Sequence, residues 1–324
     1  MTPADMDDNT AENRVPLKLI NTEDGLRCKW LNTHDKRLTE PFFDETYAKL
    51  RILDPKNRSQ PYISDLEEMQ REAQKLDAVS PVVIIFHISR CGSTLISQLF
   101  ATSGRFIVLS EVPFFDDILR LPLSMPGFNE AAIPGYFSSA LNFYGRKRDT
   151  DEEHVVMKTD CWHIFFHQEL RKMFPDTPFV MMYRSPDEVL RSNLKKPGWQ
   201  TIPELVDPRI FGLPGMPDHY QRDIYTATII EKMLGKYLEV AQTDSNSLLV
   251  NYNEGAMPVL KKIAAFAKLD INKAELMVME ERSRYHSKDP GELFNKEPVA
   301  DVPEYLNQAM RLYEVLEAKR MANG

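Results

Sequence analysis

The fold of this chain is decided by the stretch PVVIIFHISRCGSTLISQLF, which runs from Pro81 to Phe100. Residues 82–86 form a continuous apolar run, which is typical of a strand that is covered on both faces. A polar loop follows, and from about residue 93 the pattern predicts a helix that continues to about residue 102. A buried strand that leads through a short loop into a helix is the repeating unit of parallel α/β sheets.

The same alternation continues through the rest of the chain. Further short apolar runs predict strands at 106–109, 155–157, 179–182 and 247–250. Helical patterns lie between most of them, at about 130–144, 161–173, 187–195, 218–241 and 257–268. Because parallel neighbours are joined by crossovers that are usually helices, the pattern predicts an α/β three-layer sandwich with a central, mainly parallel sheet.

The composition is that of an ordinary soluble protein. Of 324 residues, 43% are hydrophobic and 27% are charged, and the net charge of −8 gives no cationic footprint for nucleic acid. The three cysteines, Cys28, Cys91 and Cys161, are too far apart for a zinc-binding pair or a disulfide framework. We find no signal peptide and no apolar run of the ~20 residues that span a bilayer. We therefore expect a cytoplasmic protein without a membrane span.

The loop after the first core strand carries groups suited to a phosphate: Ser89, Arg90, Cys91, Gly92, Ser93 and Thr94. The start of a helix offers backbone N–H groups and a partial positive charge. Gly92 allows close approach of the backbone to a ligand oxygen, and Arg90 adds a permanent, fork-shaped cation. The same residues would also form an ordinary turn in which Ser93 and Thr94 cap the helix, and the loop alone does not decide between these explanations.

The loop lacks the features of a Walker A sequence. That motif reads G-x-x-x-x-G-K-[ST], whereas here Gly92 is followed directly by Ser93 and no lysine precedes the hydroxyl pair. Magnesium-dependent ATP chemistry is therefore disfavoured, and a P-loop kinase or nucleotide hydrolase is kept as an alternative.

A second strand end carries a cation followed by a helix. The stretch FVMMYRSP, residues 179–186, places Arg184 at the end of a predicted strand and Pro186 in the first turn of the next helix, with Ser192 two turns along. An arginine in this position can bind a phosphate through two hydrogen bonds. Considered separately, Arg184 could also be an ordinary exposed arginine, and Ser192 could be a solvent-facing serine.

Together these segments resemble the nucleotide-dependent sulfotransferases. The loop is similar to the 5′-phosphosulfate loop of the branch that reads Pro-Arg-Ser-Gly-Ser/Thr-Thr-Leu, with Ser89 and Cys91 where Pro and Ser are usual. Arg184 to Ser192 is similar to the family's 3′-phosphate motif, Arg-x-Pro–helix–Ser. The resemblance covers roughly residues 80–290. It implies a P-loop NTPase-like fold, 3′-phosphoadenosine-5′-phosphosulfate (PAPS) as co-substrate, 3′-phosphoadenosine 5′-phosphate (PAP) as product, and no metal.

Two later stretches resemble the family more weakly. LLVNYNE, residues 248–254, is similar to a strand that ends in Tyr-Glu-x-Leu. RSRYHSKDP, residues 282–290, resembles the cationic loop that closes over the nucleotide, which implies that Arg284, Ser287 and Lys288 bind the cofactor. The alternative is a solvated charged loop.

The resemblance implies three catalytic residues. Arg90 would stabilise the leaving group together with Lys158, which stands at the end of a predicted strand. Glu111 lies 21 residues after Arg90, about where the Arg-type branch has its general base. The alternatives are a salt-bridged strand end for Lys158 and a helix-start acid for Glu111.

Other residues are weaker candidates. The family often uses a histidine as base, and His87 lies in the phosphate-loop segment. His163 and His167 are four residues apart and could hold a metal, but no third ligand is indicated and we expect no metal site. Trp199 could line an acceptor pocket.

These features imply sulfuryl transfer from PAPS to a hydroxyl or amine of a small-molecule, carbohydrate, lipid or peptide acceptor. A non-catalytic relative that binds a nucleotide or a partner is the further alternative, and acceptor and oligomeric state stay open. We expect a disordered segment at 1–14 and a single sulfotransferase domain at 15–324. Within the domain we expect an extension that packs on the core, the nucleotide-binding core and a C-terminal helical segment, at 15–80, 81–290 and 291–324.

Overall fold

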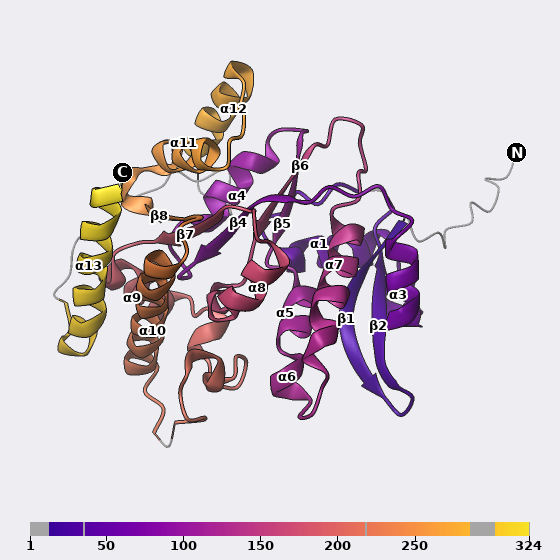
Figure 1. Ribbon diagram of the computed structural model, residues 1–324, viewed down its shortest axis with the longest axis horizontal. Helices are drawn as coiled ribbons and strands as arrows, with labels where there is room; N and C mark the ends of the chain where they lie inside the picture. The colour runs from indigo at the N-terminus through magenta and orange to yellow at the C-terminus, as the bar shows by residue number, and fades with distance from the viewer. Residues whose placement is uncertain (1–12, 35, 218, 286–301, 324) are drawn as a thin grey trace, which may run out of the picture. The chain divides into compact units, whose positions relative to one another are not determined.

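The computed structural model describes residues 13–34, 36–217, 219–285 and 302–323. The chain divides into two compact units (Figure 1). Unit 1 comprises Met1–Val82 and Ser103–Met157, and unit 2 comprises Val83–Thr102 and Lys158–Gly324. The prediction of one domain over residues 15–324 stays a prediction.

The five predicted core strands are all present and form one sheet in the order β5-β6-β4-β7-β8. Their bounds are β4 (Pro81–His87), β5 (Phe106–Ser110), β6 (His154–Lys158), β7 (Phe179–Tyr183) and β8 (Ser247–Asn251). In unit 2, β4 pairs with β7 and β7 with β8, both in parallel. Residues 83–86 and 179–183 are fully buried, as an apolar run inside a covered sheet requires. The α/β class with a mainly parallel sheet is confirmed.

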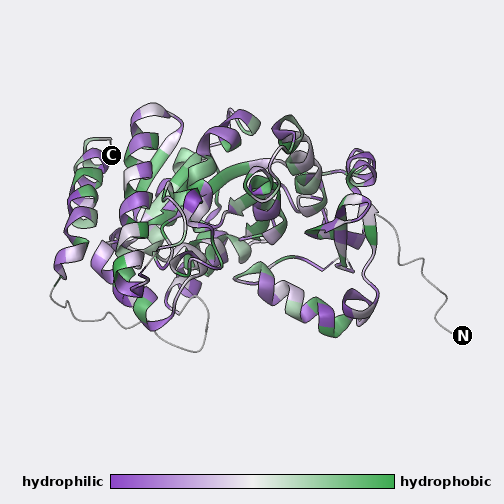
Figure 2. Cartoon of the chain, turned by 90° about the horizontal axis from the view of Figure 1, so that it is seen from below, coloured by the Kyte–Doolittle hydropathy of each residue, from purple (hydrophilic) through white to green (hydrophobic). Residues whose placement is uncertain are grey.

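Unit 2 has helices on both sides of its strands. Figure 1 shows α4, α11 and α12 on one side of β4, β7 and β8, and α9, α10 and α13 on the other. The helices are α4 (Ser93–Ala101), α8 (His167–Met173), α9 (Pro186–Lys195), α10 (Arg222–Thr243), α11 (Ala256–Phe266), α12 (Lys273–Ser283) and α13 (Asn307–Asn323). Figure 2 shows the hydrophobic colour concentrated in the central strands. The three-layer arrangement is confirmed for this unit.

Short 3-10 helices complete unit 2, and two of its elements differ from the predictions. They are η3 (Cys161–Phe166), η4 (Trp199–Thr201), η5 (Pro208–Phe211), η6 (Tyr252–Glu254) and η7 (Glu304–Leu306). The helix predicted at 161–173 is therefore α-helical only in its second half. The loop predicted at 282–290 begins inside α12, because a capping box at Asn272 starts a helix that runs to Ser283.

Unit 1 contains an antiparallel hairpin. Strands β1 (Arg14–Thr22) and β2 (Gly25–Asn32) pair antiparallel, and β3 (Ile63–Asp65) extends them. The helices are α1 (Phe43–Leu53), α2 (Lys56–Ser59), α3 (Leu66–Ala73), α5 (Pro113–Leu119), α6 (Leu121–Ser124), η2 (Glu130–Ala132) and α7 (Ile133–Tyr144). Within this unit, α5 and α7 pack on β1, and the buried rings of Trp30 and Phe143 meet with centroids 4.7 Å apart.

Regular structure begins one residue before residue 15, where the predicted domain starts. Residues 1–12 of the segment expected to be disordered lie outside the described residues, but Arg14 is the first residue of β1. Its guanidinium forms an ion pair with Glu68 at 3.2 Å and lies 3.9 Å from the centroid of the Tyr62 ring. Disorder at residue 14 is therefore wrong, because these contacts hold it.

None of the described helices combines the length and the apolar character that crossing a bilayer requires.

Candidate functional site

The loop after β4 has a strained backbone. Ser89 and Arg90 both have positive φ angles, 62° and 54°, and Gly92 follows with 83°. Such angles cost about 1–3 kcal/mol for a residue with a side chain, and they persist only where surrounding contacts impose them. A turn that combines left-handed and right-handed residues directs successive backbone N–H groups toward one point, as in many anion-binding loops.

Contacts from the strands impose this conformation. The N–H of Ile88 donates to the carbonyl of Met182 in β7 at 3.2 Å, and the thiol of Cys91 donates to the same oxygen at 3.5 Å. The N–H of Ser89 donates to Nδ1 of His87 at 3.1 Å. His87 is 5% exposed, and this ring nitrogen is occupied by the loop itself, so the structure does not favour His87 as the general base.

Gly92 is the N-cap of α4, and no side chain caps this helix. The alternative in which Ser93 and Thr94 act as helix caps is therefore wrong, because they occupy the first two helical positions. Gly92 itself lies against the ring of Tyr252, and a Cβ at this position would come within 2.2 Å of that ring. The glycine is thus required both by its φ angle and by the aromatic ring beside it.

Arg90 connects the loop with the second motif. Its Nε donates a hydrogen bond to Oγ of Ser192 in α9 at 2.9 Å, although the two residues are 102 positions apart. Burial lowers the pKa of Arg90, yet a guanidinium stays charged at any physiological pH. Unit 2 therefore brings together two of the residues that the sequence singled out separately.

Arg184 follows β7 directly, as predicted. Its Nη2 donates to Oε1 of Glu188 at 2.6 Å, and Oε2 of Glu188 accepts from the side chain of Asn253 at 2.9 Å. The Nε of Arg184 is buried and has no hydrogen-bond partner among the described residues. The Nε atoms of Arg14 and Arg191 share this feature, but Arg184 combines it with a position directly after β7, which makes it a candidate contact for an anionic ligand.

Lys158 is the last residue of β6 and is 1% exposed. Its charge acts on the loop: burial raises the pKa of the Cys91 thiol to about 11, while the positive charges of Lys158 and Arg184 oppose this rise. Both cations therefore lie close enough to the loop to contribute to its potential. The buried thiol itself is unreactive at neutral pH.

Glu111 lies in unit 1, directly after β5. It also has a positive φ angle, 53°, and the hydroxyl of the preceding Ser110 is buried without a hydrogen-bond partner among the described residues. Partial burial and the nearby carboxylate of Glu111 raise the pKa of Asp44 in α1. A small pocket beside them is lined by residues that flank both acids, including Phe43, Ser110 and Val112. Asp44 could not be identified from the sequence, because it comes from the N-terminal extension and not from the motif segments.

The remaining candidates are less well placed. Arg284 is the C-cap of α12 and forms an exposed ion pair with Glu281 at 3.1 Å, while Ser287 and Lys288 lie outside the described residues. Trp199 is 57% exposed in η4.

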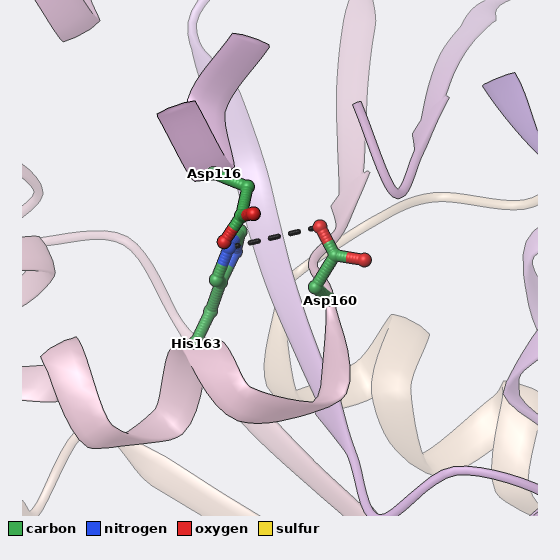
Figure 3. Close-up of side chains that lie close together, drawn as sticks. All are labelled: Asp116, Asp160 and His163. Atoms are coloured by element: carbon green, nitrogen blue, oxygen red, sulfur yellow. Dashed lines mark ion pairs between the residues drawn. The ribbon is translucent and has the colours of Figure 1, made fainter. Parts of the chain in front are cut away.

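The two histidines of the weak metal motif have separate partners. His163 pairs with Asp160 at 3.6 Å, as Figure 3 shows. His167 contacts Asp244 through Nε2 at 2.7 Å. Although they are four residues apart, the two histidines therefore contact two different acids.

No protein-family model matches the sequence, and no curated protein matches it. The structure is similar to a sulfotransferase from Alicyclobacillus acidocaldarius, with 12% identity and a TM-score of 0.42 over 75% of this chain and 95% of that one. It is similar to sulfotransferase STF9 from Mycobacterium avium, with 14% identity and a TM-score of 0.46 over 87% and 83%. A third similarity is to mouse sulfotransferase SULT7A1 complexed with PAP, with 12% identity and a TM-score of 0.40 over 80% and 90%.

Proposed function

We propose that the protein is a PAPS-dependent sulfotransferase. The observation that carries the proposal is the 2.9 Å hydrogen bond from Arg90 to Ser192, which joins the loop after β4 to the helix after β7. A ligand with phosphate groups at both ends of a nucleoside would meet cations from both motifs in unit 2.

The described residues fit the two ends of such a donor. The 5′-phosphosulfate would bind the left-handed loop, the N-terminus of α4 and the guanidinium of Arg90. The 3′-phosphate would accept from Ser192 and from Arg184, whose buried Nε has no acceptor among the described residues. Arg284, together with Ser287 and Lys288 outside the described residues, is proposed to complete the nucleotide site.

In the proposed reaction the acceptor oxygen attacks the sulfur in line with the departing phosphate. The bond between sulfur and the bridging oxygen breaks, its electron pair stays on the 5′-phosphate, and PAP leaves. Arg90 and Lys158 would stabilise the charge that develops on that oxygen. Glu111 would take the proton of the acceptor hydroxyl. This chemistry requires no metal.

Glu111 suits the role of base for two reasons. Its left-handed backbone is the kind of strain that is kept at functional sites. The carboxylate of Asp44 also lies close enough to Glu111 for the two charges to interact, and burial together with this repulsion raises the pKa of Asp44, so the pair occupies a site that disfavours two full negative charges.

The remaining parts of the proposal concern the nucleotide-binding core, the acceptor and the cellular compartment. Residues 81–290 would form the nucleotide-binding core, and the acceptor would be a small molecule, carbohydrate, lipid or peptide. The three cysteines are buried free thiols, which fits a reducing compartment such as the cytoplasm. Magnesium-dependent turnover of ATP would instead favour the kinase or hydrolase alternative.

Calorimetry with PAP tests the nucleotide site. Arg184→Ala should weaken PAP binding by about 10- to 150-fold, since hydrogen bonds to a charged group contribute about 1.5–3 kcal/mol. Adenosine 5′-phosphate lacks the 3′-phosphate, so its affinity should be the same for the wild type and the variant. A folded wild-type protein that does not bind PAP would end the proposal.

Glu111→Gln tests the base. The variant should bind PAP like the wild type but transfer labelled sulfate to a mixed panel of phenol, sugar and amine acceptors about 10²–10⁴ times more slowly, which is the usual contribution of a general base. Glu72→Gln, which removes a partly buried carboxylate paired with the exposed Lys75, serves as the matched control. Retained transfer by Glu111→Gln would remove Glu111 from the role.

A further inference from the structure

His87 connects two parts of unit 2 that carry the proposed cations. The residue ends β4 and its side chain is buried, at 5% exposure. One ring nitrogen, Nδ1, is 3.1 Å from the backbone nitrogen of Ser89, and the other, Nε2, is 3.0 Å from the carbonyl oxygen of Thr159. The imidazole therefore bridges the phosphate loop and the residue that follows Lys158.

These two partners determine where the ring proton lies. A backbone N–H can only donate, so Nδ1 of His87 must be bare to accept from Ser89. A carbonyl oxygen can only accept, so Nε2 must carry the proton and donate to Thr159. The geometry thus selects the neutral imidazole with its proton on Nε2, as a second partner selects the tautomer in other functional histidines.

Each end of the bridge is itself held. Thr159 donates to the carbonyl of Ile85 in β4 through its backbone N–H at 3.1 Å and through its hydroxyl at 3.3 Å. At the other end, Ser89 and Arg90 are the two consecutive left-handed residues of the loop. The imidazole of His87 accepts the hydrogen bond from the backbone N–H of Ser89, the first of these left-handed residues.

We propose that His87 is a positioning residue, which sets the phosphate loop and Arg90 in register with the strand end that carries Lys158. The inference rests on the proposed function, because it assigns these two cations to one leaving group. His87 acts through Ser89 and Thr159 and does not itself take the acceptor's proton. This role differs from the general base considered from the sequence.

Three substitutions separate the two hydrogen bonds. His87→Ala removes both. His87→Asn keeps an acceptor near the position of Nδ1, and His87→Gln keeps a donor near the position of Nε2. Because a displacement of about 1 Å in a catalytic group can cost about 100-fold in rate, His87→Ala should lower transfer of labelled sulfate to the acceptor panel by about that factor. His87→Asn should recover more of the rate than His87→Gln, since it restores the bond to the loop.

A matched control separates positioning from stability. His167 is also buried in unit 2 and also makes a side-chain hydrogen bond, to Asp244, but it lies outside the proposed site. His167→Ala should lower the melting temperature to a similar extent and leave the transfer rate of the folded protein unchanged. If His87→Ala and His167→Ala have the same transfer rate at matched fractions folded, the positioning role is excluded.

The tautomer gives a readout that needs no substrate. Nitrogen NMR of the ¹⁵N-labelled wild-type chain should show a bare Nδ1 and a protonated Nε2 for His87 at neutral pH. A proton on Nδ1 would overturn the inference whether or not the protein transfers sulfate. Conversely, if the wild type binds no PAP while His87 has the expected tautomer, the proposed function fails and the bridge remains as a structural feature without a catalytic role.

Discussion

Replacing Gly92 by alanine tests the geometry of the loop after β4 directly. Gly92 has a φ angle of +83°, and a Cβ at this position would lie 2.2–2.5 Å from three atoms of the Tyr252 ring. Non-bonded carbon atoms prefer separations of about 3.5–4.0 Å. The ring or the loop must therefore move by about 1 Å or more to admit one methyl group.

Two costs add in this variant. A left-handed alanine costs about 1–2 kcal/mol, because its Cβ comes too close to the following carbonyl oxygen. Overpacking of a buried site costs about 1–3 kcal/mol. We therefore expect Gly92→Ala to lower the free energy of unfolding by about 2–5 kcal/mol. If the loop takes up the movement, we also expect PAP binding to weaken by about 100-fold, comparable with the effect of a 1 Å misplacement on a reacting group.

Chemical unfolding and calorimetry with PAP measure both effects. Gly212 offers a matched control, because its φ angle is +71° and a Cβ there would meet nothing within 4 Å. Gly212→Ala should show only the backbone cost and bind PAP normally. Combining Gly92→Ala with Tyr252→Ala should relieve the clash, with a coupling energy of about 1–3 kcal/mol. Equal stability of Gly92→Ala and Gly212→Ala, together with unchanged PAP binding, would refute the reasoning.

Two further predictions follow from individual contacts. Ser192→Ala removes the hydroxyl that accepts a hydrogen bond from Arg90. We expect the transfer rate to fall by about 2- to 10-fold with little change in melting temperature, because one hydrogen bond contributes about 0.5–1.5 kcal/mol. An unchanged rate would show that Ser192 does not orient the guanidinium. Burial alone would raise the pKa of Glu40, but hydrogen bonds from Lys36 and Thr46 lower it from 4.5 to about 2. Since the folded pKa lies below the unfolded one, this stabilisation, about 1–3 kcal/mol once solvent screening is allowed for, is present above pH ~4.5 and is lost as the pH falls toward 2. Unfolding of Glu40→Gln between pH 7 and pH 2 should lack this loss, and an acid dependence equal to that of the wild type would contradict the assignment.

Local patterns were sufficient for the elements of the fold. The continuous apolar run of β4 needs no information beyond its own residues, because a strand covered on both faces is apolar at every position. The sequence also placed Arg184 directly after β7 and Pro186 at the start of α9 correctly, because proline is favoured in the first turn of a helix. The prediction was wrong for the charged segment at 282–283, where the capping box at Asn272 extends a helix with few buried residues and therefore little apolar periodicity.

The sequence by itself determined the α/β class, the strand–loop–helix segment around Arg90 and the order of the candidate cations along the chain, because these depend on residues near one another. Only the tertiary structure decided which side chains meet. Arg90 contacts Ser192 across 102 positions, and His87 contacts Thr159 across 72. Tyr252 lies against Gly92, and the sequence alone explained that glycine only by the approach of a ligand. The hydrophobic periodicity of the sequence does not predict such pairs, because they form when parallel strands bring their carboxyl ends to one edge of the sheet.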